Sequence, residues 1–257
     1  MLKRSLRYTT LVLALLLLGP LYMFASAGEA GQSSRDDGWR FANRDSVGVS
    51  PLPAEHPGAV IQVFAARAWS WRGHLAVHTW VATKTQGAES YQTHQVVGFR
   101  TRRGLPALQS QPDLPDRRWY GNAPELLVDL RGDEAEALIP RILAAVEAYP
   151  YAGDYTLWPG PNSNTFVAHV GRQVPDLGLV LPVTAIGKDY LPGGALFAAT
   201  PSGTGYQLSL LGTLGITAAK EEGLELNLLG LVLGIDFLRP ALKLPGVGRL
   251  GMSRGQH

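Results

Sequence analysis

Residues 158–166 read Trp-Pro-Gly-Pro-Asn-Ser-Asn-Thr-Phe, and the rest of the chain is best understood from this stretch outward. Pro159 and Pro161 fix their own φ angles and favour extended geometry in the residue before each. Asn162 and Ser163 are both favourable N-cap residues, so the stretch predicts the start of a helix. The unpaired N–H groups at a helix N-terminus can hold an anion or a developing oxyanion. The stretch is therefore a candidate functional site as well as a turn into a helix.

Two helices are predicted around this stretch. The one that follows it covers Thr165–Val174 and ends before Pro175. The one that precedes it, Asp133–Tyr149, has apolar residues at helical spacing and an acidic first turn that suits the helix dipole. Pro140 is expected to kink this second helix.

Strands are predicted on both sides of the helices. Ala59–Trp69, His74–Thr83 and Ser90–Arg100 are rich in β-branched and aromatic residues and have short connections, which predicts an antiparallel meander. Arg102–Asn122 is interpreted as a loop, and Glu125–Leu130 as a short strand. The later predicted strands lie within or cover Leu177–Ile186, Tyr206–Leu211, Leu224–Leu228, Leu229–Phe237 and Ala241–Leu244.

Two of the later strands alternate apolar with polar residues. In Tyr206–Leu211 and Leu224–Leu228, we expect the tyrosine and leucines to point inward and Gln, Ser, Glu and Asn to point outward. Lys220–Gly223 is interpreted as the turn between these strands. The whole pattern predicts an α+β fold in which an antiparallel sheet packs on two or more helices, as one domain of residues 59–250.

Composition excludes several classes of function. The chain has 257 residues, of which 46% are hydrophobic, and a net charge of +2 that gives no argument for nucleic-acid binding. It has no cysteine, which excludes disulfides, thiolate nucleophiles and therefore a cysteine peptidase. His74, His78 and His94 have no carboxylate at a companion spacing, so no metal site is predicted, and no cofactor.

The N-terminus indicates export. Basic residues at positions 3, 4 and 7 precede an apolar core, and Ala25-Ser26-Ala27 fits a cleavage site. Residues 1–27 are predicted to be a signal peptide or an N-terminal membrane anchor, which implies a periplasmic or inner-membrane-anchored protein. Residues 28–58 are interpreted as a linker or extended arm, and 251–257 as a flexible tail.

Two motifs carry a family resemblance. His78, in the strand motif Ala-Val-His-Thr-Trp-Val-Ala, precedes the Asn-Ser-Asn-Thr-Phe helix start at residues 162–166. This order resembles the circularly permuted papain-like proteins, the group around NlpC-type peptidases and lecithin retinol acyltransferase, in which cysteine occupies the position of Ser163. The resemblance implies a permuted papain-like fold. The strings HTW, GPNSNTF and PSGTGYQLSL also resemble an uncharacterised family of bacterial envelope proteins, which implies no activity.

The resemblance leads to an enzymatic hypothesis. Ser163 would attack an amide or ester carbonyl in a hydrolase or acyltransferase, and His78 would accept its proton. The Ser163 N–H and a nearby amide would hold the oxyanion. The residue that orients the imidazole of His78 would be His94 or Gln92, both on the next predicted strand.

A binding hypothesis stands beside it. In a catalytically inactive fold, the cleft would bind a peptide, glycan or lipid of the envelope. Asn162, Ser163 and Asn164 would donate and accept hydrogen bonds, and Trp80, Trp158 and Tyr155 would supply apolar walls. Ser163 also has a purely structural interpretation as part of a capped helix start.

Overall fold

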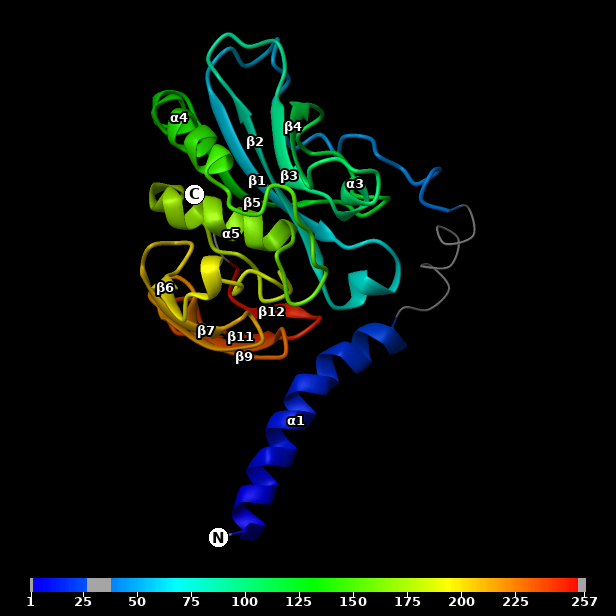
Figure 1. Cartoon of the computed structure of the whole chain (residues 1–257), viewed down its shortest axis with the longest axis vertical. Coiled ribbons are helices and arrows are strands. Elements are labelled where there is room, and N and C mark those ends of the chain that lie inside the picture. The colour runs from blue at the N-terminus through cyan, green and yellow to red at the C-terminus, as the bar shows by residue number, and fades with distance from the viewer. Residues whose placement is uncertain (1, 27–37, 254–257) are drawn as a thin grey trace.

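A computed structural model describes residues 2–26 and 38–253 (Figure 1). Two antiparallel sheets and the helices that pack on the first of them make up the body, which confirms the predicted α+β class. Parts of the predicted linker, 28–58, and tail, 251–257, lie outside the described residues, as does Ala27 of the predicted cleavage site.

The first sheet has five strands in the order β4-β3-β2-β1-β5. Its strands are β1 (Val60–Arg67), β2 (Val77–Lys84), β3 (Gln92–Val96), β4 (Leu108–Pro112) and β5 (Glu125–Arg131). The predicted meander corresponds to β1, β2 and β3. β4 lies inside the segment that was expected to be a loop, and a 3-10 turn, η2 (Ser70–His74), separates β1 from β2.

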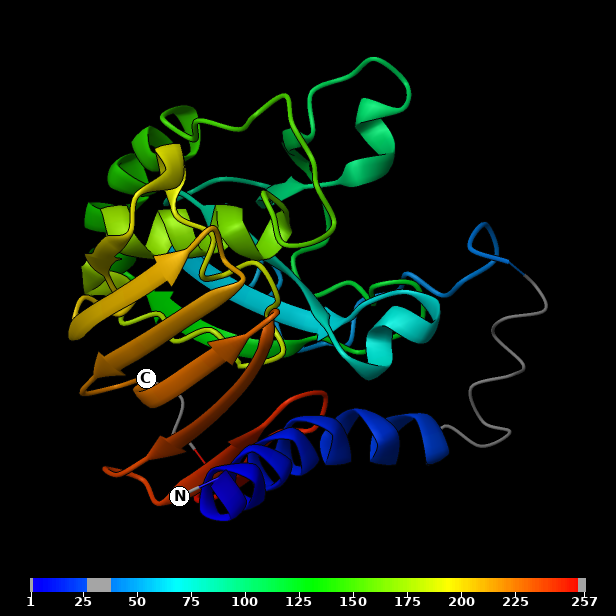
Figure 2. The same ribbon diagram turned by 60° about the horizontal axis from the view of Figure 1, so that its bottom comes forward.

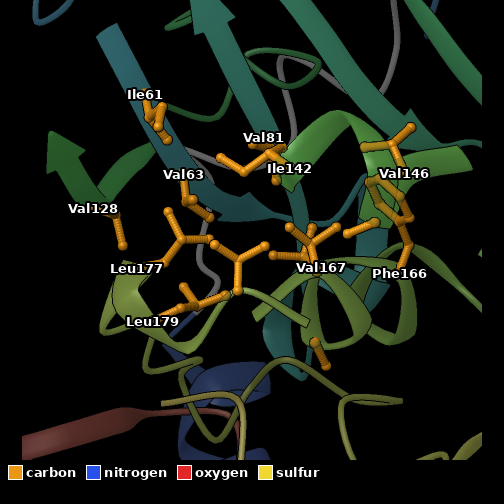
Figure 3. Packing of buried hydrophobic residues seen from close by; sticks show 14 of the residues in the cluster. Ile61, Val63, Val81, Val128, Ile142, Val146, Phe166, Val167, Leu177 and Leu179 are labelled. Atoms are coloured by element: carbon orange, nitrogen blue, oxygen red, sulfur yellow. The ribbon is translucent and has the colours of Figure 1, made fainter. Parts of the chain in front are cut away.

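Helices α4 (Asp133–Glu147) and α5 (Ser163–Gln173) cover one face of this sheet. Because strand side chains alternate between faces, Ile61, Val63 and Val81 point toward the helices, where they join a buried cluster with Ile142 and Val167 (Figure 3). The buried cluster between the sheet and the helices is the main hydrophobic core, and it fixes α5 against β2 and β3. A short helix, α3 (Gly98–Thr101), follows β3.

The opposite face of the first sheet holds a smaller apolar cluster that includes Val60, Phe64 and Trp80. The arm from residue 38 to 57 contacts this side of the sheet. Buried Asp116 accepts hydrogen bonds from Ser46 and from the backbone of residues 49 and 50. The described part of the predicted linker is therefore docked on the body.

The second sheet is a seven-stranded meander that lies on the other side of α5 (Figures 1 and 2). Its strands are β6 (Phe197–Ala199), β7 (Gly205–Leu210), β8 (Leu214–Ala219), β9 (Gly223–Leu228), β10 (Leu231–Asp236), β11 (Ala241–Leu244) and β12 (Gly248–Gly251). The expected direct pairing of Tyr206–Leu211 with Leu224–Leu228 is wrong, because β8 pairs with both. The predicted strand in Leu177–Ile186 is also wrong: after the short turn η3 (Pro175–Leu177), the chain there has no regular strand.

The alternation in the second sheet is inverted relative to the prediction. Gln207, Ser209, Glu225, Asn227 and Lys243 are buried against the body, whereas their apolar neighbours face outward. We call the exposed outward side chains the apolar face: Phe197, Tyr206, Leu208, Leu210, Leu214, Ile216, Leu224, Leu226, Ile235, Leu242 and Leu250. The periodicity correctly predicted strands, but the expectation that their apolar side would be buried was wrong.

Helix α1 (Leu2–Ala25) contacts β10 and β11 of the second sheet and leaves the body beside β12 (Figures 1 and 2). Gly19 allows the close approach, since a Cβ there would lie 2.0 Å from the carbonyl oxygen of Pro245. Among the described residues, no helix combines the length and hydropathy that a bilayer crossing requires.

Candidate functional site

The N-terminus of α5 is closed by its own side chains. Asn162 is the N-cap, and its Oδ1 accepts from the backbone N–H groups of Asn164 at 2.9 Å and Thr165 at 3.3 Å. Thr165 Oγ1 accepts in return from the Asn162 N–H at 3.1 Å, which completes a capping box. The donors of residues 162, 164 and 165 are thus occupied and are not free to hold an oxyanion.

The same side chains join α5 to its neighbours. Asn164 Nδ2 donates to the carbonyl oxygens of Val77 at 3.0 Å and Ile186 at 2.8 Å. Asn162 Nδ2 also donates to the Ile186 carbonyl, and Thr165 Oγ1 donates to that of Gly187 at 2.8 Å. Gly187 has a φ of +100°, and a Cβ there would lie 2.3 Å from Asn162 Nδ2. The segment is therefore a buried joint between α5, β2 and the 184–188 loop.

Strand β2 separates the two predicted catalytic residues. Thr79 points toward α5, where its Oγ1 donates to the Ser163 carbonyl at 3.3 Å and to Asn164 Oδ1 at 3.0 Å. His78 is the preceding strand residue, so its side chain leaves the opposite face of the sheet. There it stacks on Trp119 with ring centroids 3.6 Å apart. The structure does not bring His78 to Ser163, and the predicted dyad is not formed.

The surroundings of His78 also make it a poor base. Its Nε2 lies 3.0 Å from Gln95 Oε1, and burial lowers its pKa to about 4, against the opposing effect of that hydrogen bond. Such an imidazole is neutral at pH 7 but resists the protonation that a general base must undergo.

His94 cannot orient His78, because it lies on the other face of the sheet. It pairs with Val81 and points to the helix side, where Nε2 lies 3.1 Å from Thr83 Oγ1 and Nδ1 lies 2.8 Å from Ser110 Oγ. Burial lowers its pKa to about 4 as well. Both ring nitrogens are thus engaged by hydroxyl groups away from Ser163.

The predicted apolar walls do not enclose one cleft. Trp80 is buried on the His78 side and donates from Nε1 to the Pro115 carbonyl at 2.8 Å, beside a hollow of only about 10 Å³. The Tyr155 ring occupies the space that a Cβ of Gly98 would fill. Trp158 is half-exposed at one end of the second sheet, where its Nε1 donates to the Leu229 carbonyl at 3.0 Å.

Sequence reasoning missed a buried ionic cluster between the 188–189 loop and the second sheet. Lys188 Nζ lies 2.7 Å from Glu225 Oε2 and 3.2 Å from Asp189 Oδ1, while Lys243 Nζ lies 2.6 Å from Glu225 Oε1. Burial alone would lower the pKa of Lys188, but Asp189 and Glu225 outweigh it and raise that pKa. Lys188 and Lys243 likewise lower the pKa of Glu225 against the effect of burial. The signal for this cluster was the polar half of the β7, β9 and β11 alternation.

The cluster neutralises its own charges and needs no metal. No group of three potential His or carboxylate ligands with metal-binding geometry occurs among the described residues. Arg172 of α5 extends the cluster by donating from Nη2 to Gln207 Oε1 at 2.9 Å. These interactions hold the second sheet to α5, so the role of the cluster is structural.

Comparison with known proteins gives a family but no activity. No curated protein and no solved structure matches the chain. One family model, described as "Protein of unknown function (DUF3750)", matches residues 58–190, which is just over half of the chain. The match covers the first sheet, α4, α5 and the 184–188 loop, and it ends before β6. The chain therefore belongs to the DUF3750 family.

Proposed function

We propose that this protein is a non-catalytic binding module of the cell envelope. The observation that carries the proposal is the separation of His78 from Ser163 by the backbone of β2. Without a base within hydrogen-bond reach, the hydroxyl of a serine is a weak nucleophile. The capping box supports the same conclusion, because the Asn164 and Thr165 N–H groups next to Ser163 already donate to the Asn162 side chain.

The envelope setting of the proposal rests on the N-terminal segment. Three basic residues followed by an apolar run are typical of export or of membrane association through the N-terminus. The partner in this setting is an envelope component, for which peptide, glycan and lipid are the candidate classes. Since the predicted walls do not form a cleft, binding through an outer surface fits the geometry better than binding in an enclosed pocket.

Labelling with a serine-reactive fluorophosphonate tests the proposal against the Ser–His hydrolase. We expect folded wild-type protein to remain unlabelled, and Ser163→Ala and His78→Ala to behave identically to it. Labelling of the wild type that disappears in both variants would overturn the proposal and favour the enzyme. Circular dichroism of each variant is the control for folding.

A further inference from the structure

The second sheet presents its hydrocarbon side to the outside. Register places apolar residues opposite one another across all neighbouring strands: Phe197 pairs with Leu208, Leu208 with Ile216, and Ile216 with Leu226. At the other edge, Ile235 pairs with Leu242 and Leu242 with Leu250. The apolar face is thus continuous from β6 to β12.

The extent of this face is unusual for a surface. Strands lie about 4.8 Å apart and rise about 3.3 Å per residue, so this sheet presents a face roughly 30 Å across, which is about 20 Å long in β7 to β10 and about 10–13 Å long in β6, β11 and β12. The largest apolar patch on a typical monomer is about 300–600 Å², and patches at the upper end of that range commonly bind something. An open hollow of about 460 Å³, lined in part by Ile235, Phe237 and Leu250, adds depth to it.

The turns that connect the strands also expose apolar side chains. Leu211 and Leu229 are exposed in the β7–β8 and β9–β10 turns, and Trp158 lies beside Leu229. Phe237 and Leu238 are exposed in the β10–β11 turn. Loop tips normally carry small or polar residues, so leucine and phenylalanine at these positions enlarge the same hydrocarbon surface. Tryptophan at its margin suits the interface between acyl chains and water.

We propose that the apolar face docks on a lipid bilayer, with its side chains inserted among the acyl chains of one leaflet. The proposal builds on the binding role proposed above and names its partner. The Tyr206 hydroxyl is the one polar group at the outward positions of β7 to β11 in the described chain. A protein partner would leave such a face short of the hydrogen bonds that interfaces contain, whereas acyl chains require none. The backbone groups between strands are already paired in the ladder, so contact with lipid leaves them satisfied.

Helix α1 supports a lipid partner through charge and position. It contacts β10 and β11, and its Leu17, Leu18 and Leu21 are exposed. Its first two turns contain the basic residues at positions 3, 4 and 7, which suit anionic headgroups. Apolar side chains beside a basic segment are the combination that peripheral membrane segments use.

Vesicle flotation tests the proposal with the full chain and matched variants. The test variant combines Leu208→Gln, Ile216→Gln and Leu226→Gln, a row across three strands of the apolar face. The control combines Leu105→Gln, Leu114→Gln and Leu143→Gln, which are similarly exposed but lie on other surfaces. With phosphatidylglycerol–phosphatidylethanolamine vesicles, the test variant is expected to bind at least about tenfold more weakly than wild type. The control is expected to bind within about twofold of wild type.

Two results would overturn the proposal. One is equal vesicle binding by wild type and the test variant, which would assign any membrane affinity to α1 alone. The other is a wild-type dimer in sedimentation velocity that the test variant disrupts while vesicle binding is unchanged, which would make the face a contact between two copies. Fluorescence supplies a second readout: lipids brominated in the acyl chain are expected to quench Trp158, measured as the difference from Trp158→Phe. These outcomes do not depend on Ser163 labelling, so either proposal can fail alone.

Discussion

The imidazole of His78 is held neutral by burial between aromatic rings. Its pKa is lowered to about 4, whereas a histidine in an unfolded chain titrates near 6.5. Between these values the unfolded chain binds a proton that the folded chain does not. The free energy of unfolding is therefore expected to fall as pH falls from 6.5 to 4, by at most about 3 kcal/mol from this residue. Above pH 6.5 the stabilising contribution of His78 is fully present. His94 contributes with the same sign.

NMR titration of the His78 ring measures this pKa directly, and denaturation of wild type and His78→Gln at pH 7.5 and 5 measures its effect on stability. The variant should lose less stability than wild type over this interval. A ring pKa near 6.5 would contradict the prediction.

The capping box makes a second prediction about neighbouring residues. Asn162→Ala removes the N-cap and leaves the Leu157 and Ile186 carbonyls without its amide donor, so it is expected to cost about 2–3 kcal/mol. Ser163→Ala removes a hydroxyl that makes no hydrogen bond within the described part of the chain, and should cost less than about 1 kcal/mol. Urea denaturation of both variants checks the order, and a larger loss in Ser163→Ala would contradict it.

At the scale of single residues, the sequence predicted which residues lie in a strand or at a helix start better than it predicted the face to which their side chains point. The strand that carries His78 and the helix start at Asn162 were both correctly expected from local pattern. Their relation was not, because a shift of one residue along a strand reverses the face, and Thr79 rather than His78 points to α5. Local sequence contains no information on which of two alternating residues will meet a distant helix.

Among the elements, the second sheet depends on its buried charges. Glu225 is shared by Lys188 and Lys243, so Glu225→Gln leaves two buried ammonium groups without a full countercharge. Removing one member of a buried ionic group typically costs about 3–5 kcal/mol. Glu221→Gln, in the more exposed pair with Arg239, should cost less than about 1 kcal/mol.

Thermal unfolding with comparison of the two variants tests this contrast. Equal losses of stability would show that the cluster does not hold the sheet. Replacement of Lys188, Asp189, Glu225 and Lys243 together by uncharged residues of similar size should recover much of the loss, because none of these four buried charges is then left without a partner.

The elements also show where the pattern rules fail. Asp133–Glu147 was predicted closely because its apolar periodicity, acidic first turn and length agree with one another. The strands of the second sheet were recognised from alternation, but their orientation follows from what covers them. Lys188, Asp189 and Arg172 lie on the covering surface, so the polar side of each strand turns inward. The sequences of the strands alone do not predict which surface will cover them.

On the scale of the whole molecule, the second sheet meets α5 and the 188–189 loop through polar side chains. This implies that the first sheet and its helices can fold without the second sheet. A fragment of residues 38–195 would expose mainly Arg172, Lys188, Asp189 and their polar neighbours, which water solvates well, and it would keep the main hydrophobic core. We expect the fragment to be soluble and monomeric and to unfold cooperatively. Size-exclusion chromatography and urea denaturation test this, and an aggregated or non-cooperative fragment would contradict it.

The contacts of α1 with β10 and β11 have a consequence for the order of events during synthesis. The helix is made first, and its partner strands follow more than two hundred residues later. At about 5–20 residues per second, the nascent chain carries this leucine-rich segment for roughly 10–40 s before those strands exist. During that interval the segment is available to the cell's targeting factors, because β10 and β11, which α1 contacts in the folded protein, have not yet been synthesised.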